Sequence, residues 1–214
     1  SNNNRVLLGL KYLLKAKEYH LFLEEFKKAR ITKVLDNNSN YIESLFTEVP
    51  KEIAYEHPLG YLSYIGFYVT NIDGIKGAEL LEEAIFYYEN SSKVFQISRD
   101  NIMGEIQLIK SYIEFNHLDR MLKRMRDAHK LLHGKSKIAN KEKIITFGSP
   151  HIHYLYYREV GKFDLDLNKL ERLFNYYTDM AGGCGIGFDY QIKAEACLEH
   201  GEWRQAEILA HKAM

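Results

Sequence analysis

The residues best suited to binding chemistry lie together in the segment 147–161. Imidazole, phenol and guanidinium groups crowd this segment, and they offer ring stacking and charged hydrogen bonds to a ligand. On a helix these side chains would occupy more than one face, so one face is available to line a groove. The candidate set for ligand or partner binding is His151, His153, Tyr154, Tyr157 and Arg158. The alternative is that the tyrosines pack between helices and Arg158 forms solvated surface beside Glu159.

Two short segments contain residue types that occur in metal-binding sites. His151 and His153 are two residues apart, and on a helix they would point to different faces, which disfavours joint metal binding. The run from Asp164 to Asn168 resembles the start of a calcium loop, but Lys169 replaces the glycine that such a loop requires. We therefore expect no metal.

The phosphate and nucleophile motifs are also incomplete. Gly134-Lys135-Ser136 resembles the end of a phosphate-binding loop, but His129 stands where the first glycine is needed. The glycines between 182 and 187 have no preceding strand, so they favour a turn between helices over a dinucleotide site. Cys184 has no spaced base and orienting acid near it in sequence. We expect neither a cofactor nor an enzyme; the remaining enzyme hypothesis would centre on His151–Arg158.

Composition excludes several function classes. Lys+Arg and Asp+Glu number 29 each, so there is no bulk basic excess of the kind that nucleic-acid-binding domains show. No apolar run approaches the roughly 20 residues that span a bilayer, so we expect no membrane contact. Two cysteines are too few for a disulfide framework, which favours a reducing, cytoplasmic setting. The 16 tyrosines and 11 phenylalanines are explained first as core packing units and second as stacking surfaces for a ligand.

The elements that position these residues are predicted to be helices throughout. Only three prolines occur in 214 residues. A layout of helix, turn and return helix recurs from glycines near 60, 104, 148 and 187, about 40 residues apart, which is typical of a helical solenoid. The predicted fold is an all-α, tetratricopeptide-like superhelix of helical hairpins. We expect an N-terminal helical segment over 1–58 and about four repeats over 59–214, as one continuous domain.

The N-terminal segment and the last repeat give the sharpest local predictions. Helices are expected over 5–19, 20–35 and 41–49, with further helices opening at Pro50 and Pro58. The last repeat, 187–214, reads as two helices hinged at Gly201, a residue that can take the left-handed conformation. Trp203, which follows the hinge, is predicted to plug the open end of the pair. The predicted apolar faces are Tyr190, Ala194, Cys197 and Leu198 in the first helix, and Ala206, Leu209, Ala210 and Ala213 in the second.

Several motifs in order resemble one known family. They are the sequences at 57–64 and 147–150, the Tyr-Tyr-Arg-Glu continuation at 156–159, the glycine turn at 182–185, and the segments 194–196 and 201–213. Together they look like the helical-repeat region of large LuxR-type bacterial transcription regulators, similar to the activator of maltose genes. In that family an ATP-binding switch domain precedes the repeats and a helix-turn-helix domain follows them. This chain carries neither motif, so the resemblance implies DNA contact only through a domain outside it.

The resemblance implies an effector-sensing and protein-interaction region that relays binding of an inducer small molecule or a regulatory protein. The effector-binding residues of that family do not fall on matched positions in this chain, so the resemblance implies no particular binding residue here. The alternative hypothesis is a stand-alone tetratricopeptide-like scaffold that binds a peptide or protein partner. The helical pattern also runs up to both ends of the chain, so we expect a segment of a longer protein.

Overall fold

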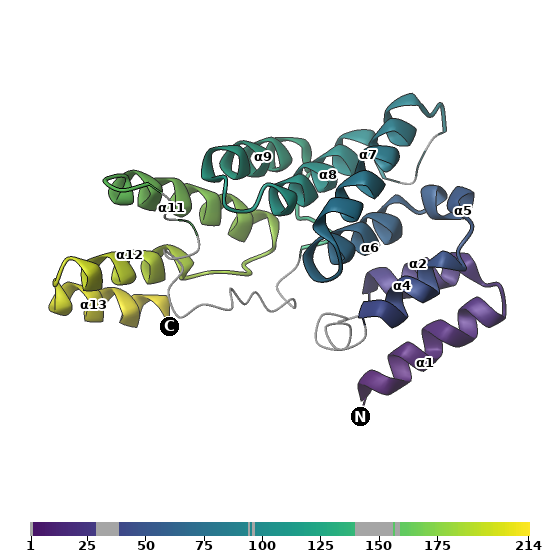
Figure 1. Ribbon diagram of the computed structural model, residues 1–214, viewed down its shortest axis with the longest axis horizontal. Coiled ribbons are helices and arrows are strands. Elements are labelled where there is room, and N and C mark those ends of the chain that lie inside the picture. The colour runs from purple at the N-terminus through teal and green to yellow at the C-terminus, as the bar shows by residue number, and fades with distance from the viewer. Residues whose placement is uncertain (1, 29–38, 94, 96, 140–155, 157–158) are drawn as a thin grey trace. The chain divides into compact units, whose positions relative to one another are not determined.

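The computed structural model describes residues 2–28, 39–93, 95, 97–139, 156 and 159–214 (Figure 1). All regular secondary structure in these ranges is α-helical, which confirms the all-α prediction for the described part of the chain. The chain divides into two compact units, Ser1–Ile113 and Glu114–Met214. This division differs from the predicted segments 1–58 and 59–214, since helices from both sides of residue 58 pack together in the first unit.

The first unit is built around one helix that is buried on nearly all sides. Its helices are α1 (Asn2–Lys15), α2 (Tyr19–Lys28), α4 (Ser39–Thr47), α5 (Lys51–Glu56), α6 (Pro58–Asn71), α7 (Gly74–Asn90) and α8 (Arg99–Ile113). The central helix α6 contacts α2, α5, α7 and α8. Almost every residue from Pro58 to Tyr68 is buried, as expected of a helix that is apolar around its whole circumference.

Aromatic rings fill much of this unit. Phe46 of α4 stacks on Tyr64 of α6 with centroids 3.6 Å apart, and Phe26 of α2 meets Phe46 edge-on at 4.7 Å. Tyr68 is buried, and its hydroxyl donates to Oε1 of Glu43 at 2.7 Å. Burial, then the hydrogen bond to Glu43, raise the pKa of Tyr68 to about 12. For these rings core packing, the first explanation of the aromatic content, is confirmed.

The turn between α6 and α7 supplies a helix cap. Asp73 is the N-cap of α7, and its Oδ1 accepts hydrogen bonds from the backbone N–H groups of Ile75 at 2.8 Å and Lys76 at 3.0 Å. These two donors have no partner within the helix, so the carboxylate satisfies them and also interacts favourably with the helix dipole.

Asp73→Ala is therefore expected to lower the free energy of unfolding by about 1 kcal/mol. Chemical denaturation followed by circular dichroism measures the loss. The matched control is Asp73→Asn, which keeps an acceptor and should retain most of the stability. Equal losses in both variants would show that the carboxylate contributes through its charge and not through capping.

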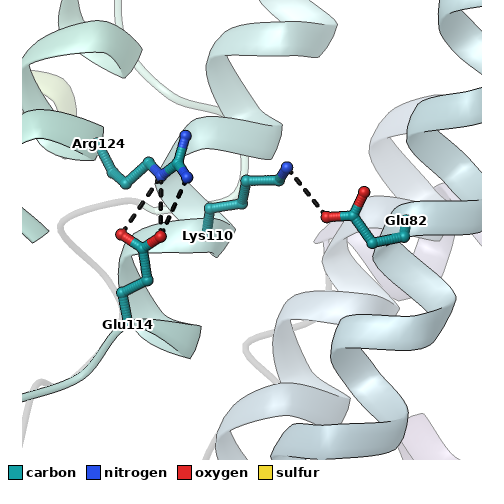
Figure 2. A network of polar contacts seen from close by, with 4 residues as sticks. All are labelled: Glu82, Lys110, Glu114 and Arg124. Carbon is teal, nitrogen blue, oxygen red and sulfur yellow. Dashed lines mark hydrogen bonds and ion pairs between the residues drawn. The ribbon is translucent and has the colours of Figure 1, made fainter. Parts of the chain in front are cut away.

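The second unit consists of α9 (Leu118–Leu131), α11 (Phe163–Met180), α12 (Phe188–Glu199) and α13 (Trp203–Ala213). Helix α11 packs against α9 and α12, and α12 forms a close hairpin with α13. Arg124 of α9 binds the carboxylate of Glu114 through its Nε and Nη2 at 3.0–3.3 Å (Figure 2). This fork geometry fixes the chain entering α9.

The predicted turns of the repeats are confirmed where they are described. Gly201 has φ +76 after the end of α12, and Gly182, Gly183, Gly185 and Gly187 all have positive φ between α11 and α12. The helix predicted from Gly60 begins at Pro58, and the helix predicted from Gly104 begins at Arg99. The predicted first helix of the third repeat, from Gly148, lies outside the described residues apart from Tyr156 and the residues from Glu159 onward.

The burial of several residues in the final hairpin was predicted wrongly. Trp203 does not plug the hairpin, because it is 70% exposed at the first position of α13. Tyr190 and Leu198 are each 37% exposed, whereas Ile192 and Ala196 are buried. Ala194 of the predicted face is buried, and because α12 contacts α11 as well as α13, the buried side of the helix also includes Ile192 and Ala196. On α13, Ala206 and Leu209 are buried as predicted, but Ala210 is exposed.

Candidate functional site

The binding set predicted from the sequence lies outside the described residues. This applies to His151, His153, Tyr154, Tyr157 and Arg158. Their neighbour Tyr156 is described: it is buried and meets the ring of Phe115 edge-on at 5.4 Å. Burial raises the pKa of Tyr156 to about 12. The binding role of the five predicted residues therefore stays a prediction.

A different candidate site is described in the first unit, beside α5 and α7. It is a surface hollow of about 700 Å³, lined by Lys51, Tyr55, Glu82, Glu83, Phe86, Tyr87, Asn90 and Ser91. Its volume falls in the range of small-ligand sites, about 300–1,000 Å³. The lining residues come from α5, from α7 and from the residue after α7. We refer to these eight residues as the α7 hollow.

Aromatic rings form the wall of the α7 hollow. The rings of Tyr55 on α5 and Tyr87 on α7 are stacked with centroids 4.2 Å apart and planes 8° from parallel. Phe86 is 72% exposed, which leaves the face of a large apolar ring in contact with solvent. Burying such a ring under a ligand would release about 25 cal/mol for each Å² removed from water. The hollow therefore offers stacking and apolar contact.

Charged pairs border the same hollow. Lys51 of α5 forms an ion pair with Glu83 of α7, and this hydrogen bond raises the pKa of Lys51. Glu82 is paired with Lys110 of α8 at 3.0 Å (Figure 2). The Lys51–Glu83 pair is half-exposed and Glu82 is largely exposed, so each pair contributes little to stability. Ion pairs of this kind can exchange partners with a ligand, and they place a lysine donor and glutamate acceptors at the border of the aromatic wall.

Behind the aromatic wall lies a fully buried tyrosine. The ring of Tyr88 meets Tyr87 at 5.5 Å and Tyr55 at 6.2 Å, both edge-on. Within the described structure its hydroxyl has no hydrogen-bond partner. Burial, the largest cause, raises the pKa of Tyr88 far above its usual range. A buried hydroxyl without a partner costs free energy, so this position is less stable than its packing alone would make it.

Tyr88→Phe is accordingly expected to raise the free energy of unfolding by about 1 kcal/mol, because it removes the unpaired hydroxyl and keeps the ring. The control is Tyr68→Phe, which removes a hydroxyl that is bonded to Glu43 and should lower stability by about 1 kcal/mol. Denaturant unfolding curves of the two variants give the comparison. A loss of stability in Tyr88→Phe would show that an ordered water satisfies the hydroxyl in solution.

The described structure also places two thiols and an exposed histidine–aspartate pair. Cys184 and Cys197 form no disulfide, and burial is the main cause that raises the pKa of each thiol, which favours the unreactive protonated form. Nε2 of His129 lies 2.6 Å from Oδ2 of Asp179, and this exposed pair joins α9 to α11. Among the described residues no group of three or more His, Cys, Asp or Glu side chains is placed to hold a metal ion.

None of the helices in the described ranges is long and apolar enough to cross a membrane.

Comparison with known proteins does not extend these observations. No protein-family model, no curated protein and no solved structure matches the chain.

Sequence reasoning missed the α7 hollow, although one signal pointed to it. In the sequence, Ala78, Leu81, Ala84, Ile85 and Tyr88 recur at helical spacing after Gly74, which predicts an apolar face; all of them except the half-buried Ala78 are buried. Phe86 falls on the opposite face, among glutamates, where a large apolar ring has no packing role. The stack of Tyr55 on Tyr87 joins two separate helices, and no local pattern predicts it.

Proposed function

We propose that this chain is a binding module that senses a small molecule or a protein segment through the α7 hollow. The observation that carries the proposal is the hollow itself. An exposed Phe86 lies beside a stacked tyrosine pair, with exchangeable ion pairs at the border. Such a mixture of apolar wall and few polar groups is typical of ligand sites.

A finer proposal places this module in a LuxR-type transcription regulator, as its tetratricopeptide-like sensing region. Support comes from the order of the family-like motifs and from the antiparallel hairpins formed by α6 with α7 and by α12 with α13. The mechanism would be a population shift. A ligand that contacts both α5 and α7 favours the arrangement of these helices that it binds more tightly, and that preference is relayed to partner domains.

The binding proposal is tested by a thermal-shift screen of sugars, nucleotides and peptides. A ligand present at about 100 times its dissociation constant stabilises its site by roughly 2.7 kcal/mol. Phe86→Ala should weaken binding of each hit by about tenfold or more, since it removes the exposed ring from the site. The matched control is Ile75→Ala, which removes a 78% exposed side chain from the same helix but outside the hollow. Hits that bind Phe86→Ala as well as the original chain would contradict the proposal.

The regulator proposal needs its own experiment. In a cell that expresses the full reading frame, deleting this region should abolish or alter inducer dependence of the regulated genes. Inducible transcription that persists unchanged after the deletion would contradict it. The stand-alone scaffold is favoured instead if the α7 hollow binds a peptide while the reading frame encodes neither a phosphate-binding loop before this region nor a helix-turn-helix after it.

A further inference from the structure

Two histidines face each other where α2 meets the start of α6. Nδ1 of His20 lies 2.5 Å from Nε2 of His57, and the ring centroids are 4.7 Å apart. His20 is the second residue of α2, and His57 is both the C-cap of α5 and the N-cap of α6. The imidazole pair therefore connects α2 to the α5–α6 joint by a side-chain hydrogen bond.

The same joint is closely packed at backbone level. A Cβ atom added to Gly60 would lie 2.9 Å from both Cβ and the carbonyl oxygen of Leu23, a distance that real Cβ contacts do not show. Leu23 itself is fully buried. Since α2 and α6 already touch at Gly60, the histidine rings one turn away have little freedom to separate while this contact is intact. A change at the rings is thus transmitted to the helix contact.

The hydrogen bond between the rings depends on their proton count. One proton between the two facing nitrogens gives a donor and an acceptor, whether the pair as a whole is neutral or carries a single positive charge. A second positive charge places N–H against N–H, which removes the acceptor and adds like-charge repulsion. The contact is therefore compatible with at most one imidazolium.

The charged groups around the rings do not offset a second imidazolium well. Oε1 of Glu24 is 3.8 Å from Nδ1 of His57, but its other oxygen is bound by Lys27 at 2.7 Å. The pKa of Glu56 on α5 is lowered first by its hydrogen bond from Lys93, at 2.7 Å, and to a smaller degree by the charges of both rings. Each nearby carboxylate is thus already paired with a lysine. Within the described structure these four groups, on α2, on α5 and after α7, are the charged neighbours that bear on the pair.

We propose that the His20–His57 pair is a pH-sensitive contact that holds α2 on the α5–α6 joint at neutral pH and releases it in mildly acidic solution. Because a histidine titrates near pH 6.5 when unperturbed, the change falls in a physiologically accessible range. The module then has two arrangements at this joint, and the pH determines their ratio. This inference concerns the joint alone and does not depend on the α7 hollow binding a ligand.

The sign follows from the groups around His57. Burial of the ring, then the charge of His20, lower the pKa of His57, while Glu24 opposes them. A folded-state pKa below the unfolded value of about 6.5 means that the unfolded chain takes up the proton first. The stabilising contribution of the pair is therefore complete above about pH 6.5 and is lost as the pH falls below that value.

Amide hydrogen exchange of the full chain tests the proposal. EDTA is present so that no metal ion binds the two imidazoles, and the measured rates are corrected for the intrinsic dependence of exchange on pH. Between pH 7.5 and 5.5 the protection of α2 amides should fall by about tenfold relative to amides of α11, which lie in the other unit. In the double variant His20→Gln/His57→Gln this pH response should disappear. A control variant, His211→Gln, changes an exposed histidine of α13 and should keep the response. Protection in α2 that follows α11 at both pH values would overturn the proposal.

Nuclear magnetic resonance titration of the ring C–H signals gives a second readout that does not require the double variant to fold. A pair that shares one proton titrates in two separate steps, the lower of them clearly below pH 6.5. His20→Gln alone should move the titration of His57 back toward its ordinary range, because it removes the second charge. Independent single steps near pH 6.5 for both rings would overturn the proposal.

Discussion

Replacing Gly187 by alanine is expected to destabilise the second unit by about 3 kcal/mol. Gly187 is the N-cap of α12 and has φ +90, a conformation that costs an L-residue about 1–2 kcal/mol. In addition, the new Cβ would lie 2.4 Å from the carbonyl oxygen of Ala213 and 3.1 Å from its Cα. Both of these atoms are backbone, so the overlap can be relieved only by moving α13 away from the start of α12.

The matched control for this effect is Gly201→Ala. Gly201 also has a positive φ of +76, but no atom lies within 4 Å of an added Cβ. This variant should therefore lose only the conformational strain, about 1 kcal/mol. Denaturant unfolding followed by circular dichroism separates the two effects. If both variants lose the same free energy, the close approach of α12 and α13 at Ala213 is not a feature of the folded protein.

Gly77→Ala is the second substitution with a large expected effect, a loss of about 2 kcal/mol. Alanine in place of glycine within a helix normally gains 0.5–1 kcal/mol, so a loss requires a specific cause. Here the added Cβ would lie 2.6 Å from Cγ2 of Val69 and 3.0 Å from its Cα. At Gly77, α7 lies so close to α6 that no room is left for a methyl group. The substitution would force the two helices apart.

Gly74→Ala is the control for this prediction. Gly74 begins the same helix, and the nearest atom to its added Cβ is the carbonyl oxygen of Val69 at an ordinary 3.8 Å. This variant should be neutral or slightly more stable, because alanine restricts the unfolded chain without a clash. Melting temperatures of the two variants, measured side by side, decide the point. A stable Gly77→Ala protein would mean that α6 and α7 pack less closely than described.

These glycines show how helices pack within each unit. Glycines lie where two helices come into close contact: Gly60 and Gly77 in the first unit, and Gly187 in the second. A glycine at such a contact lets the backbones of the two helices approach closely, because it has no side chain to keep them apart. The histidine pair lies one turn from the helix contact at Gly60, so its geometry depends on that close contact being kept.

The helical class and the turns marked by glycine could be predicted from the sequence. A helical period of apolar residues, few prolines and glycines at regular spacing are local signals, and each acts on a few neighbouring residues. The left-handed turn at Gly201 and the glycine turn before α12 were predicted for this reason. The turn after α1 was not, because Lys17 takes φ +59 there and no glycine marked it; the predicted helix over 5–19 in fact ends at Lys15.

Which faces are buried and which residues form the candidate site depend on packing between separate helices. Ile192 is buried although it lies off the predicted face, because α12 packs on α11 and α13 at once and a single apolar stripe does not specify two partners. Tyr55 and Tyr87 are 32 positions apart, and His20 and His57 are 37 apart. Their contacts arise where separate helices converge on α6, and the position of that convergence depends on side-chain packing along the whole unit.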